Sequence, residues 1–142
     1  MCVCSMNKTL EQWIALYNKK IPEGFERDKR FELFYLPNKG FAEVMDSGKM
    51  VWVNQMCGDF KFWRDFVEKV TQKLGYSHAG TLCIRNVKAY IRMAGFTVDR
   101  IEKTAQGDRY FCTDKHSGQK GQASPAGKDT YYITWEVTAN GA

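Results

Sequence analysis

GKMVWVNQMCGDFKFWRDFVEKVTQKLGY, residues 48–76, changes its apolar period at Gly58. Up to Gln55 the side chains alternate with a period of two and include β-branched and aromatic types, which is typical of a strand. From Phe60 the apolar side chains recur at intervals of three and four residues, so they fall on one face of a helix. The stretch therefore predicts a strand that stops at the glycine and a helix over 59–74. The core-facing side chains of this helix are expected to be Trp63, Phe66, Val67 and Val70.

The turn between the predicted strand and helix is a candidate anion site. Asp59 is a good N-cap for the helix, and Gly75 is a good residue to end it. A strand that turns through glycine into a helix directs free backbone N–H groups and the positive end of the helix dipole away from the sheet edge. Such a turn can hold a phosphate. The alternative is a purely structural junction, since turns of this kind occur throughout αβ proteins.

The composition indicates a single globular domain over residues 1–142. The chain is 44% hydrophobic and 26% charged, which excludes the disordered class, and it is long enough to bury a core. The net charge of +5 is modest, with a local basic excess over 103–128. A polyanionic partner is thus allowed but not required, and the lack of an arginine-rich tract does not favour nucleic acid.

The five cysteines indicate a reducing compartment. Cys57, Cys83 and Cys112 lie in apolar, strand-like contexts that are typical of small buried thiols. Cys2 and Cys4 lack the spacing of a zinc site, so we expect no metal. No apolar run reaches the roughly 20 residues that span a bilayer, and no secretory core is seen, so we expect a cytoplasmic protein without membrane contact.

The remaining patterns predict an α/β (α+β) protein with a mostly antiparallel sheet flanked by helices. Residues 116–129 are rich in Gly, Ser and Lys and predict a flexible loop. We expect residues 1–6 to be disordered, and Met6 is an alternative start. Besides the elements above, we expect helices over 7–20 and 86–94 and strands over 31–36, 40–45, 77–84, 96–103, 109–113 and 131–137.

RNVKAYIRMAGF, residues 85–96, resembles the closing signature of the GNAT acetyltransferase superfamily, in which an Asn, an Ala and a Tyr precede Gly-Phe. The matching residues are Asn86, Ala89, Tyr90, Gly95 and Phe96. The order of predicted elements over 31–115 is also similar to that of small phage or prophage proteins of GNAT type. The resemblance implies a GNAT-like mixed, mostly antiparallel central sheet and an acyl-CoA-dependent N-acetyltransferase. Its cofactor would be acetyl-CoA, and its acceptor a small-molecule or protein amine.

In GNAT proteins the corresponding turn holds the pyrophosphate of acetyl-CoA on its backbone N–H groups. The loop here departs from the family pattern, because it has a single glycine and places Asp59 where the diphosphate would lie. An aspartate in this position can instead satisfy the N–H groups itself and close the site to anions. The resemblance assigns cofactor binding to Gln55, Met56, Cys57, Gly58, Asp59, Phe60, Lys61 and Asn86.

Acetyl transfer to an amine needs a base for the attacking nitrogen and an acid near the leaving thiolate. The resemblance makes Tyr90 the candidate acid, and the alternative is a helix aromatic that packs while its hydroxyl stays wet. Glu43 and His78 are the candidate bases, and each is also compatible with a structural place in the sheet. Cys57, at the start of a helix, is an alternative nucleophile.

Two further functions stay open. One is a catalytically inactive GNAT-shaped protein that binds a host or phage protein in the cytoplasm of a bacterial host. The other, weaker alternative is a nucleic-acid binder with basic residues around Tyr110 and Phe111. Those basic residues are Lys103, Arg109, Lys115, Lys120 and Lys128.

Overall fold

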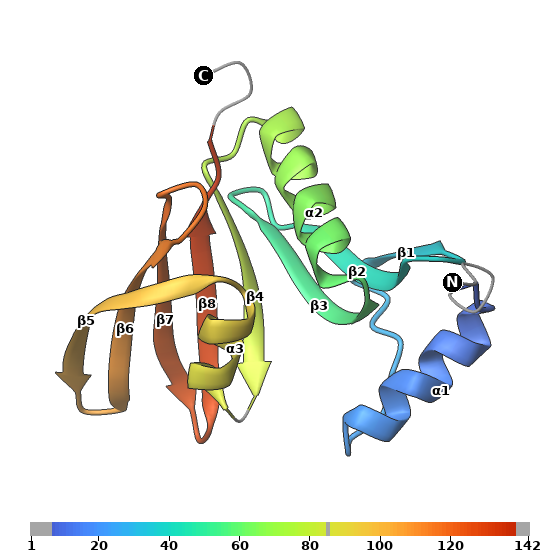
Figure 1. Ribbon diagram of the computed structural model, residues 1–142, viewed down its shortest axis with the longest axis horizontal. Coiled ribbons are helices and arrows are strands. Elements are labelled where there is room, and N and C mark those ends of the chain that lie inside the picture. Colours follow the sequence, from blue (N-terminus) through green and yellow to red (C-terminus); the bar gives the residue numbers. More distant parts are fainter. Residues whose placement is uncertain (1–6, 85, 139–142) are drawn as a thin grey trace. The chain divides into compact units, whose positions relative to one another are not determined.

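The structure, a computed structural model, describes residues 7–84 and 86–138. Within these ranges three helices and eight strands form an α+β fold, which confirms the predicted class (Figure 1). The chain divides into two compact units, Met1–Val70 and Thr71–Ala142, and each is described by itself. The expectation of a single domain stays a prediction, and the expected disorder of the first six residues lies outside the described residues.

The first unit is an antiparallel meander with one helix before it and one after it. β2 lies between β1 and β3 and pairs antiparallel with both. The last turn of α2 extends past Val70 into the second unit. These elements confirm the predicted order of helix, meander and helix. Their bounds are α1 (Leu10–Lys20), β1 (Glu32–Leu36), β2 (Gly40–Asp46), β3 (Val51–Gly58) and α2 (Phe60–Leu74).

Helix α1 is fixed by a cap at its start and by a tryptophan on its buried side. Thr9 Oγ1 accepts a hydrogen bond from Gln12 N at 3.1 Å, and Gln12 Oε1 accepts one from Thr9 N at 2.9 Å, which forms a capping box. Trp13 is 4% exposed, packs with Phe41, and donates from Nε1 to Pro37 O at 3.0 Å. The helix therefore rests on the strands through a shared core.

Helix α2 packs against the meander through aromatic side chains. Trp63 and Val67 are each 1% exposed, as the predicted apolar face requires. Phe66 is half-buried, with its ring centroid 4.8 Å from that of Phe34. Trp63 Nε1 also donates to Lys39 O at 2.8 Å, which ties the first turn of α2 to the turn between β1 and β2.

The second unit is a five-stranded antiparallel sheet with one short helix. The strand order is β4-β8-β7-β6-β5, so the last strand of the chain lies beside the first strand of the unit. All of these elements except β7 were predicted from the sequence. Their bounds are β4 (His78–Ile84), α3 (Val87–Met93), β5 (Phe96–Thr104), β6 (Gly107–Asp114), β7 (Lys120–Gly127) and β8 (Thr130–Glu136).

The two faces of this sheet differ in what covers them. On the covered face, α3 packs over buried side chains, and Figure 1 shows this helix on one side of the sheet. The alternate residues of the same strands form the open face, where Leu82 is 41% exposed and Tyr132 is 50% exposed. The buried side chains of the covered face include Ala79, Cys112, Ala123, Ile133 and Trp135.

Strand β7 lies within residues 116–129, for which the composition predicts a flexible loop. Its residues pair with β6 on one side and β8 on the other, so the loop prediction is wrong for Lys120–Gly127. The sequence of β7 lacks the apolar alternation of a typical strand, because the covered face has room only for small residues there. A Cβ on Gly121 would lie 2.8 Å from the Phe96 ring. Pro125, which cannot donate a ladder hydrogen bond, lies beyond the last residue paired with β6 and beside a register shift against β8.

Candidate functional site

The turn between β3 and α2 is built on two glycines that face each other across β2 and β3. Gly40 and Gly58 are partners in the ladder, and their φ angles are 100° and 113°. A Cβ on Gly58 would lie 2.1 Å from Lys39 O, and one on Gly40 would lie 1.9 Å from Cys57 O. The strand ends at a glycine because the two backbones approach too closely to admit a side chain.

Asp59 caps helix α2 and so occupies the candidate anion site. Its Oδ1 accepts a hydrogen bond from Phe62 N at 3.0 Å, and its Oδ2 accepts one from Lys39 Nζ at 3.3 Å. The backbone hydrogen bond from Phe62 lowers the pKa of the Asp59 carboxyl, and Lys39 lowers it further. A carboxylate of the protein therefore lies where the GNAT resemblance places a diphosphate.

A groove lies beside this turn in the first unit, and we call it the lysine groove. Lys8, Lys20 and Lys39 line it, together with the apolar side chain of Trp13 and the cap residue Asp59. Ammonium groups thus outnumber carboxylates among its described lining residues. The groove offers positive charge next to a partly apolar wall.

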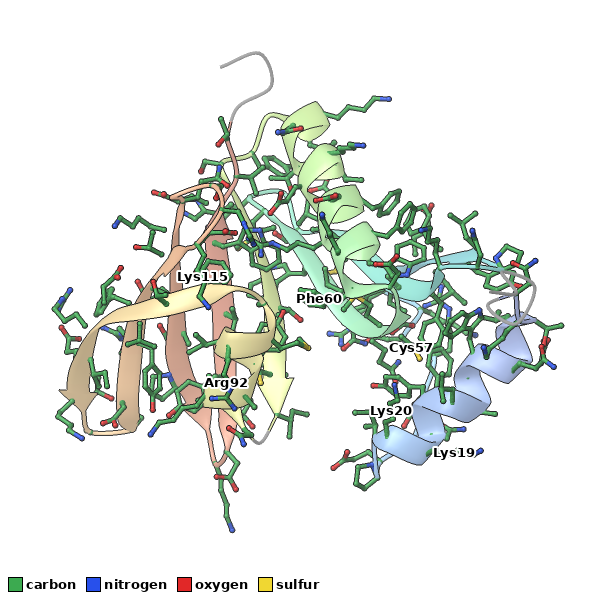
Figure 2. The ribbon with its side chains drawn as sticks, in the orientation of Figure 1. Lys19, Lys20, Cys57, Phe60, Arg92 and Lys115 are labelled. Atoms are coloured by element: carbon green, nitrogen blue, oxygen red, sulfur yellow. The ribbon has the colours of Figure 1, made fainter. Side chains whose placement is uncertain are left out.

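Two lysines of the groove act electrostatically on Cys57, at the end of β3. Burial raises the pKa of the Cys57 thiol, and the charges of Lys20 and Lys8 offset only part of that rise. Figure 2 shows Lys20 on the side of α1 towards Cys57, whereas Lys19 projects elsewhere from the same helix. Cys57 is 7% exposed, and its thiol remains protonated near neutral pH, which argues against Cys57 as the nucleophile.

Glu43, a candidate base, is completely buried in the first unit. Its Oε2 accepts hydrogen bonds from Arg27 Nη1 at 2.8 Å and from Asp28 N at 2.9 Å. Its Oε1 accepts from Asn54 Nδ2 at 2.9 Å and from Gln55 Nε2 at 2.8 Å. Both oxygens are doubly hydrogen-bonded, so the carboxylate holds the strands and the preceding connector together rather than facing a substrate.

A β-bulge lets two consecutive side chains reach this carboxylate. The β2–β3 register shifts between Ala42 and Val44, so Asn54 and Gln55 of β3 together face Glu43. In a regular strand, adjacent residues would point to opposite faces. The GNAT resemblance assigns Gln55 to the cofactor, and because periodicity alone cannot reveal a bulge, the sequence does not predict Asn54 beside Glu43.

The residues assigned to the cofactor divide between the two units. Gly58 and Asp59 line the lysine groove. Gln55 also accepts a hydrogen bond from Glu26 N at 3.0 Å, so its side chain is engaged within the protein. Asn86 lies in the second unit, where its Oδ1 accepts from Ala89 N at 3.0 Å and caps α3. Of the other assigned residues, Met56 and Cys57 lie near the end of β3, and Phe60 and Lys61 lie in the first turn of α2.

Tyr90 and His78 lie on opposite faces of the second unit's sheet, so the structure does not bring these two candidates together. Tyr90, on α3, lines a small apolar cavity over the covered face with Ile133. His78 begins β4 on the open face, opposite Glu136, and its Nδ1 lies 2.8 Å from Ser77 Oγ. Neither of these contacts joins an acid to a base.

A scan against protein-family models and searches of curated proteins and of solved structures each returned no match for this chain. Within residues 7–84 and 86–138, no group of three His, Cys, Asp or Glu side chains is placed to share a metal ion. Cys2 and Cys4 lie outside these ranges. In the same described part of the chain, no helix combines the length and the apolar character that a membrane span requires.

Proposed function

We propose that this chain is a GNAT-type binding protein that holds a phosphate-bearing ligand of the acyl-CoA class in the lysine groove. The observation that carries the proposal is the gathering of Lys8, Lys20 and Lys39 in one groove of the first unit. Ammonium groups attract phosphate oxygens, and a concave site concentrates their field. Leu16, which is half-buried and also lines the groove, supplies an apolar surface for the less polar parts of such a ligand.

In this proposal the lysines replace the backbone N–H groups that hold the diphosphate in the GNAT family. The Asp59 carboxylate already accepts the Phe62 N–H, and its negative charge repels an incoming phosphate. An anion that enters the lysine groove need not displace that cap. The ligand's phosphates are therefore expected against the ammonium groups and not on the helix end.

The geometry favours binding over acetyl transfer. Both oxygens of Glu43 are engaged, and Tyr90 and His78 lie on opposite faces of their sheet. A base and an acid must both reach the reacting groups within hydrogen-bond distance. A binding role needs neither, and a host or phage protein is the proposed partner of the bound form.

The test is a calorimetric titration of the full chain with CoA and acetyl-CoA at low salt. Lys20→Ala should weaken binding about tenfold, because it removes one charge-assisted contact. Lys19→Ala, its neighbour on α1 outside the groove lining, should leave the affinity unchanged. Binding should also weaken as salt rises, since the contacts are ionic. No binding at about millimolar ligand, or equal losses in both variants, would contradict the proposal.

A GNAT-type acetyltransferase is the second candidate function. The element order of helix, meander, helix, strand, short helix and strand favours it, together with the glycine turn that leads into α2. It predicts release of free CoA thiol from acetyl-CoA when small amines or lysine peptides are added, and loss of that release in Tyr90→Phe. Binding without thiol release would leave the binding protein as the better account.

A further inference from the structure

The open face of the second unit carries aromatic side chains on β6 and β8, the two strands that flank β7. Tyr132, on β8, is 50% exposed and lies beside Leu82 of β4 in the ladder. Phe111, on β6, is half-buried, and the Arg100 guanidinium carbon lies 3.9 Å from its ring centroid. Exposed rings and a guanidinium plane are the surfaces on which unpaired nucleobases stack.

A hollow on this face is lined by Phe111 and by side chains that can form hydrogen bonds. The ladder aligns Arg100, Phe111, Gln122 and Thr134 in one row across β5, β6, β7 and β8, and all four line the hollow. The Gln122 amide, whose Nε2 donates one hydrogen bond to Ser124 Oγ at 2.8 Å, has a second N–H and an oxygen, and the Thr134 hydroxyl has both a donor and an acceptor. Groups of this kind can read the edges of bases that stack on the row.

A second β-bulge shapes the edge of this row. The β5–β6 register shifts between Val98 and Arg100, so Asp99 and Arg100 both reach the open face. Asp99 accepts a hydrogen bond from Thr113 Oγ1 and lies 3.9 Å from Lys120 Nζ. The bulge therefore positions the arginine plane over Phe111 instead of directing it to the covered face.

The charge of the second unit suits a polyanion. Residues 71–142 hold ten Lys and Arg against six Asp and Glu, whereas residues 1–70 hold eleven against ten. The cations on the open face itself have carboxylate neighbours: Glu102 lies 2.9 Å from Arg109 and 3.6 Å from Arg100. The net positive charge of the whole unit therefore attracts a polyanion, whereas the open face itself is nearly neutral. On that face, stacking of the bases supplies most of the affinity.

From these observations we propose that the open face binds single-stranded nucleic acid, with bases stacked on the Arg100 plane that covers Phe111 and on the Tyr132 ring. The inference goes beyond the proposed function, because all of its residues belong to the second unit and none lines the lysine groove. Duplex nucleic acid is excluded as the occupant, since its bases are stacked on one another and cannot lie on the rings.

The test is fluorescence anisotropy of the full chain with labelled oligouridylate and oligothymidylate of about 12 nucleotides, within the range of single-strand sites. Tyr132→Ala should weaken binding roughly 5- to 150-fold, the effect of losing one stacked base. Arg100→Lys should also weaken binding while it keeps the salt dependence, because it retains the charge and loses the plane. Met93→Ala removes an apolar side chain of α3 that is at least as exposed as Tyr132, and it should have no effect.

Several outcomes would overturn this inference. They are an absence of binding at about 50 mM salt, equal affinity for duplex and single strands, or a loss in Met93→Ala as large as that in Tyr132→Ala. A dimer in sedimentation that Tyr132→Ala dissociates would also overturn it, since a second copy would then cover the face. Unchanged melting temperatures of the variants serve as the folding control. Because Tyr132 is half exposed, its loss should not unfold the sheet.

Discussion

Asp59 determines what the start of α2 can bind. A carboxylate at a helix N-terminus is stabilised by the backbone N–H that it accepts and by the positive end of the dipole. The same charge makes that end unattractive to a phosphate. With Phe62 N at 3.0 Å and Lys39 Nζ at 3.3 Å, the Asp59 carboxylate acts as the anion of this site.

Replacing Asp59 by alanine should lower the free energy of unfolding by about 1 kcal/mol, the usual effect of losing a cap. Asp59→Asn keeps a capping oxygen, so it should lose only the charge contribution, about 0.3–1 kcal/mol. Urea unfolding measures both variants. A loss below about 0.3 kcal/mol in Asp59→Ala would contradict the capping role.

The charge contribution of Asp59 should depend on pH. Its pKa in the folded state is lowered from 3.8, so the added stability is fully present above that value and is lost as the pH falls through the folded pKa. The difference in melting temperature between the wild type and Asp59→Asn should therefore vanish in acid. A difference that instead grew below pH 3.8 would mean that the sign is wrong.

Glu43→Ala should be far more destabilising than any surface change. It leaves donors from Arg27, Asn54 and Gln55 without their acceptor in a buried setting, which should cost about 3–5 kcal/mol. The matched control is Glu32→Ala on β1, an exposed position where the change should stay within about 0.5 kcal/mol. A loss at Glu43 no larger than at Glu32 would remove its structural role.

At the scale of elements, the two β-bulges have the same effect in different units. One turns Asn54 and Gln55 towards Glu43, and the other turns Asp99 and Arg100 to the open face. The sequence predicts the strands that contain the bulges, because one inserted residue leaves most of the apolar alternation of each strand intact. It cannot show that two adjacent side chains share a face, since that depends on the partner strand.

The glycines just before and just after α2 give a matched pair of substitutions. Gly58 and Gly75 have φ angles of 113° and 78°, but a Cβ meets backbone only at Gly58. Gly75→Ala should therefore cost about 1 kcal/mol for its left-handed conformation. Gly58→Ala should cost clearly more, because β2 and β3 must separate. Equal losses in urea unfolding would contradict the close approach of Gly58 to Lys39 O.

Strand β7 should be protected from hydrogen exchange. The amides over 121–123 lie between β6 and β8, so they should exchange slowly, whereas those of the β5–β6 turn over 105–106 should exchange fast. This reverses the expectation from composition, in which Gly, Ser and Lys indicate a mobile loop. Fast exchange across 121–123 would restore that expectation.

At the scale of the whole molecule, the sequence predicts individual helices and strands, but it does not predict which distant residues these elements bring together. Helix and strand periods in the two units follow from local chemistry, which is why α1, α2 and most strands were predicted. The pairing of β4 with β8 joins the first and last strands of one unit, and no local pattern encodes it. The lysine groove likewise gathers residues from α1, its preceding segment and the β1–β2 turn. Each lysine alone looks like part of a solvated surface.

The most direct test of ligand binding in the lysine groove is an amide chemical-shift titration of the full chain with CoA, because it reports each backbone N–H separately. Binding in the lysine groove predicts the largest shifts at Lys8, Lys20 and Lys39, with the Phe62 amide unchanged because Asp59 still accepts its hydrogen bond. The largest shifts at Lys61 and Phe62 would contradict it, since the phosphates would then have taken the helix end from Asp59.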